Sequence, residues 1–358
     1  MGLCIKTKSY GAANLLEVCA HLTAKNKLSI IKFKPPKVLK NTPDFEDVHG
    51  QFHAKRALEV AAAGGHNILL YGPPGTGKTM LASRLPSIMP PLLQSQSLEV
   101  TSIHSLCGYK YQHWQVPPFR NPHHTASSVA LVGGGSHPKP GEISLAHHGV
   151  LFLDELPEFQ RQVLEVLREP LESGVIQISR ATAQLSFPAR FQLVAAMNPC
   201  PCGYLTSRST NAQQRCTCTL EQIQRYRKKI SGPLLDRIDL HVSVNSLSID
   251  ELNLGTKKHN ENEPSLAIRE RVIAARTIQY KRQECNNADL SVKQLEHYCP
   301  LGEAERELIG RAIETMGLSA RAYHRIVKVA QTIADLSASP SIEDAHIGEA
   351  LGLRNFDR

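Results

Sequence analysis

Residues 72–79 read Gly72-Pro73-Pro74-Gly75-Thr76-Gly77-Lys78-Thr79, which has the spacing of a phosphate-binding loop. The loop follows a short apolar run and precedes a helical pattern that begins with Met80, the strand, loop and helix setting that this motif needs. We expect the glycines to bring backbone N–H groups onto the phosphates, with Lys78 at the β- and γ-phosphates and Thr79 on Mg²⁺. The alternative is an ordinary glycine-rich turn before a helix. The sequence therefore predicts a site for ATP or another nucleoside triphosphate.

A second motif, Gly149-Val-Leu-Phe-Leu-Asp154-Glu155, is an apolar strand that ends in two carboxylates. Ligands of open α/β sheets bind at the carboxyl ends of strands, so this pair is expected beside the phosphate loop. We expect Asp154 in the Mg²⁺ shell and Glu155 to orient the attacking water, which favours hydrolysis over binding alone. The alternative for an isolated Asp-Glu pair is a helix N-cap with a charged first turn. The phosphate loop favours the Walker B interpretation.

The composition bounds the class of protein. A chain of 358 residues with 41% hydrophobic residues is long enough for two or three domains with a proper core. Because no apolar segment matches a transmembrane span and the N-terminus has no signal-peptide pattern, we expect a soluble, cytoplasmic protein without a membrane partner. The nine cysteines are expected as thiols or metal ligands rather than disulfides. A net charge of +8 permits a polyanionic partner such as nucleic acid without being evidence for one.

Three segments differ in their residue pattern. Residues 1–44 combine a short helical stretch with a linker that contains lysine and proline. Residues 45–247 alternate strand-like runs with helical patterns, which predicts an α/β fold with a parallel sheet and crossover helices. Residues 248–358 predict an α-helical lid, with amphipathic helices over 266–282, 292–297, 303–316, 320–335 and 342–351.

An amide side chain follows another strand-like run. The run over 191–197 ends in Asn198-Pro199, and its end is expected one strand away from the two carboxylates. Asn198 would then hydrogen-bond the attacking water or the γ-phosphate, as a sensor 1 residue does. The alternative is a plain Asn-Pro turn that contacts no ligand.

Two arginines further along the chain are candidates for sensing the γ-phosphate. Arg237 could complete the site of a neighbouring subunit as an arginine finger, a contribution worth roughly 10³–10⁵ in rate. The alternative is an ordinary salt bridge to Asp236 or Asp239. Arg321 opens a lid helix and resembles a sensor 2 residue, and Arg325, four residues on and on the same helix face, is the fallback.

Cysteines occur in two close pairs, Cys200 with Cys202 and Cys216 with Cys218. Four thiols in this arrangement predict a tetrahedral Zn²⁺ site, which would be structural because four thiolates leave no open position for substrate. A spacing of one intervening residue is less usual than a Cys-x-x-Cys knuckle. Reduced structural thiols and a redox pair therefore remain the alternatives.

Taken together, these motifs resemble the magnesium-chelatase-like AAA+ ATPases of the ComM/YifB type from about residue 47 to the end. The resemblance rests on blocks that include Phe119-Arg-Asn-Pro-His-His-Thr and Asn198-Pro-Cys-Pro-Cys-Gly-Tyr, with the others at 49–66, 140–147, 153–159 and 231–241. It implies a ring, typically a homo-hexamer, with ATP between subunits. For the ComM branch it implies DNA branch migration and helicase activity during natural transformation and homologous recombination. By the same analogy Gln51 lies near the adenine.

The N-terminus departs from that family. The family usually carries a complete Lon-protease-like domain, whereas residues 9–22 resemble only its final helix. The chain therefore looks N-terminally truncated, with residues 1–44 as the remnant of that domain and its linker. Residues 199–219 form a cysteine-rich insertion within the nucleotide-binding domain.

Two further insertions are the expected DNA contacts. Residues 127–142 resemble the helix-2 insertion loop with Lys139, and residues 174–187 resemble the pre-sensor-1 β-hairpin with Arg180 at its tip. Repeated around a ring, such cations give a salt-sensitive track for a phosphate backbone without base readout. Solvated loop charges are the alternative. The basic run 225–229 fits either a nucleic-acid contact or a subunit interface.

Three functions are compatible with these residues. The first is an ATP-driven DNA motor, and the second is a chelatase-type motor subunit that drives metal insertion or remodels a protein partner. The cysteine insertion and the His-His-Thr block favour the first. The third is a scaffold in which ATP only sets assembly, and the presence of Glu155, Asn198 and Arg237 argues against it.

Overall fold

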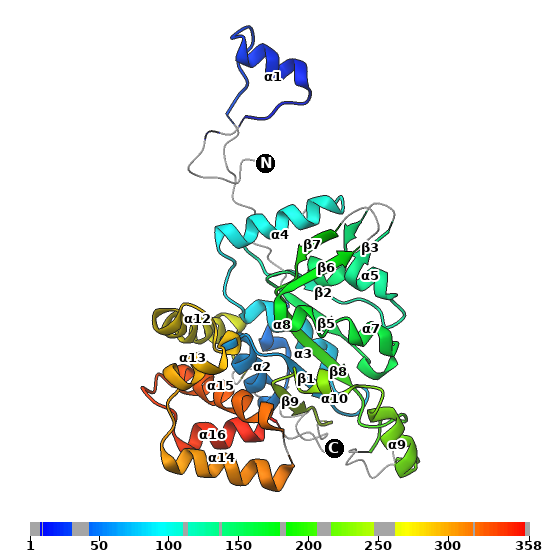
Figure 1. Cartoon of the computed structure of the whole chain (residues 1–358), viewed down its shortest axis with the longest axis vertical. Coiled ribbons are helices and arrows are strands. Elements are labelled where there is room, and N and C mark those ends of the chain that lie inside the picture. Colours follow the sequence, from blue (N-terminus) through cyan, green and yellow to red (C-terminus); the bar gives the residue numbers. More distant parts are fainter. Residues whose placement is uncertain are drawn as a thin grey trace. The chain divides into compact units, whose positions relative to one another are not determined.

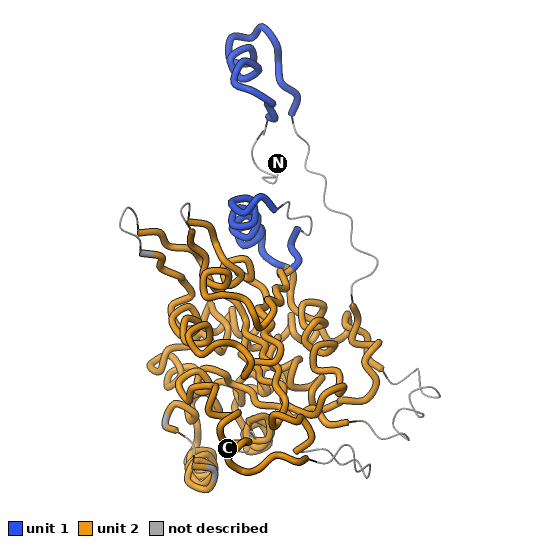
Figure 2. The backbone as a smooth tube through the Cα atoms, turned by 90° about the vertical axis from the view of Figure 1, so that its right-hand side faces the viewer, with its two compact units in different colours: residues 1–41, 92–116 blue, residues 42–91, 117–358 orange. Residues whose placement is uncertain are grey.

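The computed structural model of the chain describes residues 8, 10–30, 43–109, 114–135, 138–179, 184–205, 216–246, 262–317 and 319–354. The chain divides into two compact units, coloured in Figure 2. The first comprises residues 1–41 and 92–116 and contains helices α1 (Leu15–Leu22) and α4 (Gln94–Leu106). The second comprises residues 42–91 and 117–358 and contains the phosphate loop and the strands named below.

A five-stranded parallel sheet forms the centre of the second unit (Figure 1). Its strands in spatial order are β2 (Phe119–Arg120), β5 (Val150–Leu153), β8 (Gln192–Met197), β1 (Ile68–Tyr71) and β9 (Leu240–Ser243). Leu70 of β1 lies between its register partners Ala196 of β8 and Val242 of β9. The predicted α/β fold with a parallel sheet is confirmed. Because all five strands run the same way, the loops after β1, β5 and β8 open at one edge of the sheet.

Apolar side chains cover both faces of this sheet. In β1, Ile68 and Leu70 belong to one hydrophobic cluster and Leu69 to another, since successive side chains of a strand point to opposite faces. The first cluster includes residues of α2 (Phe52–Gly64) and α3 (Lys78–Ile88), and the second includes residues of α6 (Glu142–Leu145), α7 (Arg161–Glu165) and α10 (Gly232–Leu235). Burial on both faces explains why the strands read as continuous apolar runs.

The C-terminal region is helical, as predicted. Its helices are α12 (Ser265–Gln283), α13 (Val292–Tyr298), α14 (Glu303–Met316), α15 (Ala320–Leu336) and α16 (Asp344–Gly352). Figure 1 shows them in yellow to red beside α2, with which α12 and α15 are in contact. Arg276 of α12 also donates hydrogen bonds to the carbonyl oxygen of Ala62 in α2, at 3.0 and 2.6 Å. The division into two units does not separate these helices from the sheet, so the boundary at 247–248 remains a prediction.

Two antiparallel hairpins project from the α/β core. One pairs β3 (Gly133–Gly134) with β4 (Lys139–Pro140) after helix α5 (Ser128–Val132), and the other pairs β6 (Val175–Ser179) with β7 (Gln184–Pro188). Both predicted insertions thus contain a hairpin. The remaining short helices are α8 (Pro170–Ser173), α9 (Leu220–Arg227), η1 (Phe45–Asp47), η2 (Leu156–Glu158) and η4 (Asn287–Asp289). Among the described helices, none is long and apolar enough to cross a membrane.

Candidate nucleotide-binding site

The phosphate loop joins the end of β1 to the start of α3, as its sequence predicts. Gly77 caps α3 with φ of 86°, in the left-handed region that glycine adopts without steric cost. A Cβ at Gly72 would lie 2.0 Å from the carbonyl oxygen of Val244, so the backbone that follows β9 also requires glycine there. The Thr76 hydroxyl donates to the Pro73 carbonyl at 2.9 Å and fastens the bend. The loop is therefore pinned by its own bonds and by the neighbouring strand.

Lys78 folds its side chain back over this loop. Its Nζ donates to the carbonyl oxygens of Gly72 and Pro73, both at 2.8 Å, and to Asn198 Oδ1 at 3.2 Å. Burial lowers the pKa of Lys78 to about 8, although the Asp154 carboxylate works in the opposite direction. A bound phosphate would add negative charge beside the ammonium group and raise that pKa again.

The two predicted Mg²⁺ ligands are in direct contact. The Thr79 hydroxyl, on the first turn of α3, donates to Asp154 Oδ2 at 2.6 Å, at the end of β5. Mg²⁺ in phosphate-transfer sites is held by oxygen ligands, usually one or two carboxylates together with substrate phosphates and water. A hydroxyl and a carboxylate beside a phosphate loop fit this donor set, and Thr79 is open to solvent.

Glu155 lies beyond Asp154 in a constrained backbone conformation. Its φ is 52°, a left-handed value that costs a non-glycine residue of order 1–3 kcal/mol. Its carboxylate Oε2 lies 3.0 Å from Nδ1 of His124. His124 sits in the loop after β2, and β2 pairs with β5, which positions Glu155. Sequence reasoning gave His124 no role, because only the pairing of β2 with β5 brings the loop after β2 beside Glu155.

Gln51, just before α2, lies between the phosphate loop and the segment that follows β9. Its backbone has φ of 54°, and its Nε2 donates to the carbonyl oxygen of Asn245 at 2.7 Å, with the carbonyl oxygen of Thr76 at 3.5 Å. The side chain therefore ties the start of α2 to the loop. Its expected place near an adenine stays a prediction.

Arg237 is buried within its own subunit. Its guanidinium pairs with Glu172 of α8 and donates to the carbonyl oxygen of Pro233 at 2.6 Å. Only 7% of Arg237 is exposed, and its Nε has no hydrogen-bond partner among the described residues. The sequence offered a salt bridge to Asp236 or Asp239 as the alternative role of Arg237, but its ion-pair partner is the more distant Glu172. The arginine-finger role stays a prediction and requires Arg237 to leave Glu172.

Arg321 and Arg325 have different surroundings although they share a helix face in α15. Arg325 forms an ion pair with Asp239, whose carboxylate also accepts from the Asn67 N–H at 3.0 Å. Burial alone would raise the pKa of Asp239, but Arg325 and His66 outweigh it and hold that pKa well below its usual range. Arg321 is exposed. The predicted sensor 2 side chain is therefore the more available of the two.

The predicted DNA-contacting residues are only partly described. Lys139 is exposed on β4, where it pairs in register with Gly134. Arg180 lies outside the described residues. The basic run 225–229 contributes Arg225, Lys228 and Lys229 to the lining of a hollow of about 360 Å³, which Glu158 and Arg161 also line. This hollow is compatible with both interpretations of that run.

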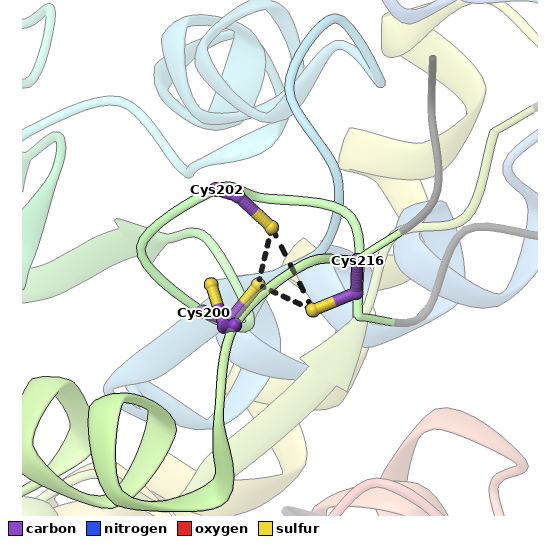
Figure 3. A group of neighbouring side chains, drawn as sticks. Cys200, Cys202 and Cys216 are labelled. Carbon is purple, nitrogen blue, oxygen red and sulfur yellow. Dashed lines mark hydrogen bonds between the residues drawn. The ribbon is translucent and has the colours of Figure 1, made fainter. Parts of the chain in front are cut away.

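The four predicted zinc ligands converge where the turn after β8 meets the segment before α9. Their sulfur atoms all lie within 4.8 Å of one another, although residues 203–215 separate the two pairs in sequence. Figure 3 shows three of them, with Sγ–Sγ distances of 3.3 Å from Cys200 to Cys202, 3.7 Å from Cys200 to Cys216 and 3.6 Å from Cys202 to Cys216. Four thiols this close together have the composition of a metal site.

The fold and these motifs define a P-loop protein of the AAA+ class. Residues 44–252 match the family model "Magnesium chelatase, subunit ChlI", and residues 262–354 match "Magnesium chelatase, subunit ChlI C-terminal". The chain belongs to the magnesium-chelatase-like family of the ComM/YifB type, which confirms the resemblance seen in its sequence.

Similar proteins cover nearly the whole chain. Competence protein ComM of Haemophilus influenzae is 49% identical over 362 residues, which covers 98% of this chain and 68% of that protein. Uncharacterized protein YifB of Salmonella typhimurium is 45% identical over 360 residues, with coverage of 100% and 69%. More distantly, DNA replication licensing factor mcm6 of Dictyostelium discoideum is 24% identical over 305 residues, with coverage of 81% and 30%.

Proposed function

We propose that the chain is an ATP hydrolase that works as a hexameric motor on DNA. The observation that carries the ATPase part is the convergence of Lys78, Thr79, Asp154 and Asn198 through direct contacts at one sheet edge. The DNA part draws support from relatives named as a competence protein and a DNA replication licensing factor. We further propose that the activity is branch migration or helicase action in natural transformation and homologous recombination, in the cytoplasm.

The chemistry follows from the positions of the side chains. Thr79 and Asp154 would hold Mg²⁺, which supplies charge neutralisation at the phosphates. When ATP binds, Lys78 would exchange its backbone carbonyl partners for phosphate oxygens. Asn198 Oδ1, which accepts a hydrogen bond from Lys78 in this structure, would lie beside the γ-phosphate. Glu155 orients the attacking water once its carboxylate leaves His124. Catalysis of this kind depends on positioning and charge rather than on covalent intermediates.

Assembly completes the site in this proposal. Arg237 leaves Glu172, which is 61% exposed and therefore easily solvated, and reaches the nucleotide of a neighbouring subunit. The exposed Arg321 contacts the same phosphates from the lid. Hydrolysis then shifts the lid helices against the sheet, and the two hairpins, with Lys139 and Arg180, move along the phosphate backbone.

The test is steady-state ATP hydrolysis with and without single-stranded, duplex and forked DNA at two salt concentrations. We expect DNA to stimulate hydrolysis and salt to weaken that effect, because each phosphate contact on a single strand contributes about −0.7 to the slope of log affinity against log salt. Lys78→Ala should abolish tight ATP binding, and Glu155→Gln should bind ATP without turnover. Lys139→Ala should weaken stimulation, while Lys293→Ala, an exposed lysine on α13, serves as the matched control.

A chelatase-type motor that drives metal insertion or remodels a protein partner is the second candidate. The match to the magnesium chelatase subunit model favours it, because that model covers the ATPase core itself. Rapid hydrolysis by assembled rings that ignores every DNA would select this candidate and refute the DNA motor. Normal turnover by Glu155→Gln would refute the site assignment under either candidate.

A further inference from the structure

The cysteine cluster has the geometry of a four-thiolate metal site. Four sulfur atoms at about 2.3 Å from one Zn²⁺ in a tetrahedron lie about 3.8 Å from one another. The three distances of 3.3, 3.7 and 3.6 Å lie close to that value, and all are far longer than a disulfide bond of about 2.05 Å. Thiolate ligands exclude Mg²⁺ and Ca²⁺, which prefer oxygen. The chain therefore brings two sequence-distant pairs to the spacing that one ion needs.

We infer that Zn²⁺ binds Cys200, Cys202, Cys216 and Cys218 and that it positions Asn198 for ATP hydrolysis. The first link is short and runs through the turn that begins at Cys200. A Cβ at Gly203 would lie 2.7 Å from Pro74 Cδ of the phosphate loop and 3.8 Å from Asn198 Cγ. The turn thus packs directly against both the loop and the sensor side chain.

The second link runs through helix α9. Cys218 immediately precedes Thr219, whose side chain accepts a hydrogen bond from the Gln222 N–H and caps the helix. Tyr226, on the last turn of α9, is 6% exposed, and the backbone of Asn198 lies near its hydroxyl group. An ion held by both cysteine pairs would therefore fix the start of α9 as well as the turn after β8. Asn198 would be held from both sides.

The consequence falls on hydrolysis more than on binding. Asn198 Oδ1 accepts from Lys78 Nζ at 3.2 Å, so a displaced Asn198 would lose its place at the γ-phosphate end. Thr79 and Asp154 are in contact with each other at 2.6 Å, and the Thr76 hydroxyl fastens the loop to the Pro73 carbonyl at 2.9 Å, so we expect nucleotide still to bind. The metal assignment stands on the cysteines alone, whereas the coupling rests on the proposed ATPase.

The experiment measures metal content, ATP affinity and single-turnover hydrolysis on the whole chain, without DNA. We expect about one zinc per chain, and Co²⁺ substitution should give thiolate charge-transfer and tetrahedral d–d absorption. Cys216→Ser should lose the metal and slow hydrolysis at least tenfold while ATP affinity changes less than threefold. Cys285→Ser, which alters a partly buried cysteine outside the cluster, should keep both metal and rate.

A second route avoids variants that fail to fold. Chelation of the wild-type protein should slow hydrolysis and lower the thermal midpoint, and added Zn²⁺ should restore both. Metal-free, folded protein with four reactive thiols would overturn the site, and so would iron in place of zinc. Zinc that can be removed without change in hydrolysis would overturn the positioning role. Metal content is measured without ATP. A protein that binds zinc but does not hydrolyse ATP would therefore contradict the proposed function and leave the metal site intact.

Discussion

Loss of the Arg325 guanidinium should destabilise the fold, whereas loss of Arg321 should not. Arg325→Ala leaves Asp239, 3% exposed, without the ion pair that dominates its surroundings. The Asn67 N–H at 3.0 Å and His66 Nδ1 at 3.6 Å remain and compensate in part. Removal of one partner of a buried ion pair costs about 3–5 kcal/mol. Since Arg325 itself is 25% exposed, we expect the lower end, ~3 kcal/mol.

The dependence on pH has a definite sign. Pairing lowers the folded-state pKa of Asp239, so its contribution to stability is present above an unfolded pKa of about 3.9 and is lost as pH falls through the folded value. In Arg325→Ala the folded pKa rises. The difference in unfolding free energy between wild type and variant should therefore be largest near neutral pH and should shrink below pH ~4. Lys328 also faces this carboxylate and limits the change.

The assay is urea unfolding at neutral and acidic pH, combined with ATP hydrolysis. Arg321→Ala is the matched control: its unfolding free energy should stay within about 0.5 kcal/mol of wild type, as is usual for surface substitutions, while hydrolysis falls. The double variant Arg325→Ala/Asp239→Ala should be less destabilised than the sum of the single changes. A cost below ~1 kcal/mol for Arg325→Ala, or one independent of pH, would refute the buried-pair argument.

Three other predictions concern groups that the reaction would move. ATP affinity should fall as pH rises through about 8, because Lys78 loses its proton there in the free protein, whereas bound phosphates raise its pKa. Calorimetry in two buffers of different ionisation enthalpy would detect the proton taken up on binding. An ATP affinity that stayed constant to pH 10 would contradict this prediction. His124→Ala should release Glu155, raise basal ATP hydrolysis two- to threefold and weaken the stimulation by DNA. If the ratio of DNA-stimulated to basal hydrolysis were unchanged in this variant, the contact with His124 would not restrain Glu155. Arg237→Ala and Glu155→Gln should each be inactive alone but regain hydrolysis when mixed in one ring, and no recovery would exclude action in trans.

Much of the fold and of the nucleotide site follows from local sequence pattern. The phosphate loop, the strand before Asp154 and the strand before Asn198 can each be recognised from a short stretch of sequence. Parallel pairing of β1, β5 and β8 then brings their carboxyl ends to one edge of the sheet. The helices after the sheet were predictable for the same reason, since their apolar spacing is local.

Partner choice was not predictable in this way. Arg237 meets Glu172, Arg325 meets Asp239 and His124 meets Glu155, pairs separated by 65, 86 and 31 positions. Such pairs depend on strand order and on how side chains fill the space between elements, which no local pattern encodes. The cysteine cluster is intermediate, because composition proposed the four ligands and only the fold could bring the two pairs together.

Energies separate the contacts that can switch from those that cannot. Glu155 and His124 are 52% and 31% exposed, and even a charged pair at such an exposed position is worth only about 0–1 kcal/mol, so nucleotide or DNA binding can break the contact. Glu172 is 61% exposed and regains water when Arg237 leaves, so that contact is also reversible in a ring. The Arg325–Asp239 pair is different, because separating it would strand a buried charge at about 3–5 kcal/mol. Glu155 and Arg237 therefore rest on solvent-exposed partners that they can leave. The buried pair instead joins α15 to the residue before β9 and holds the frame in which they move.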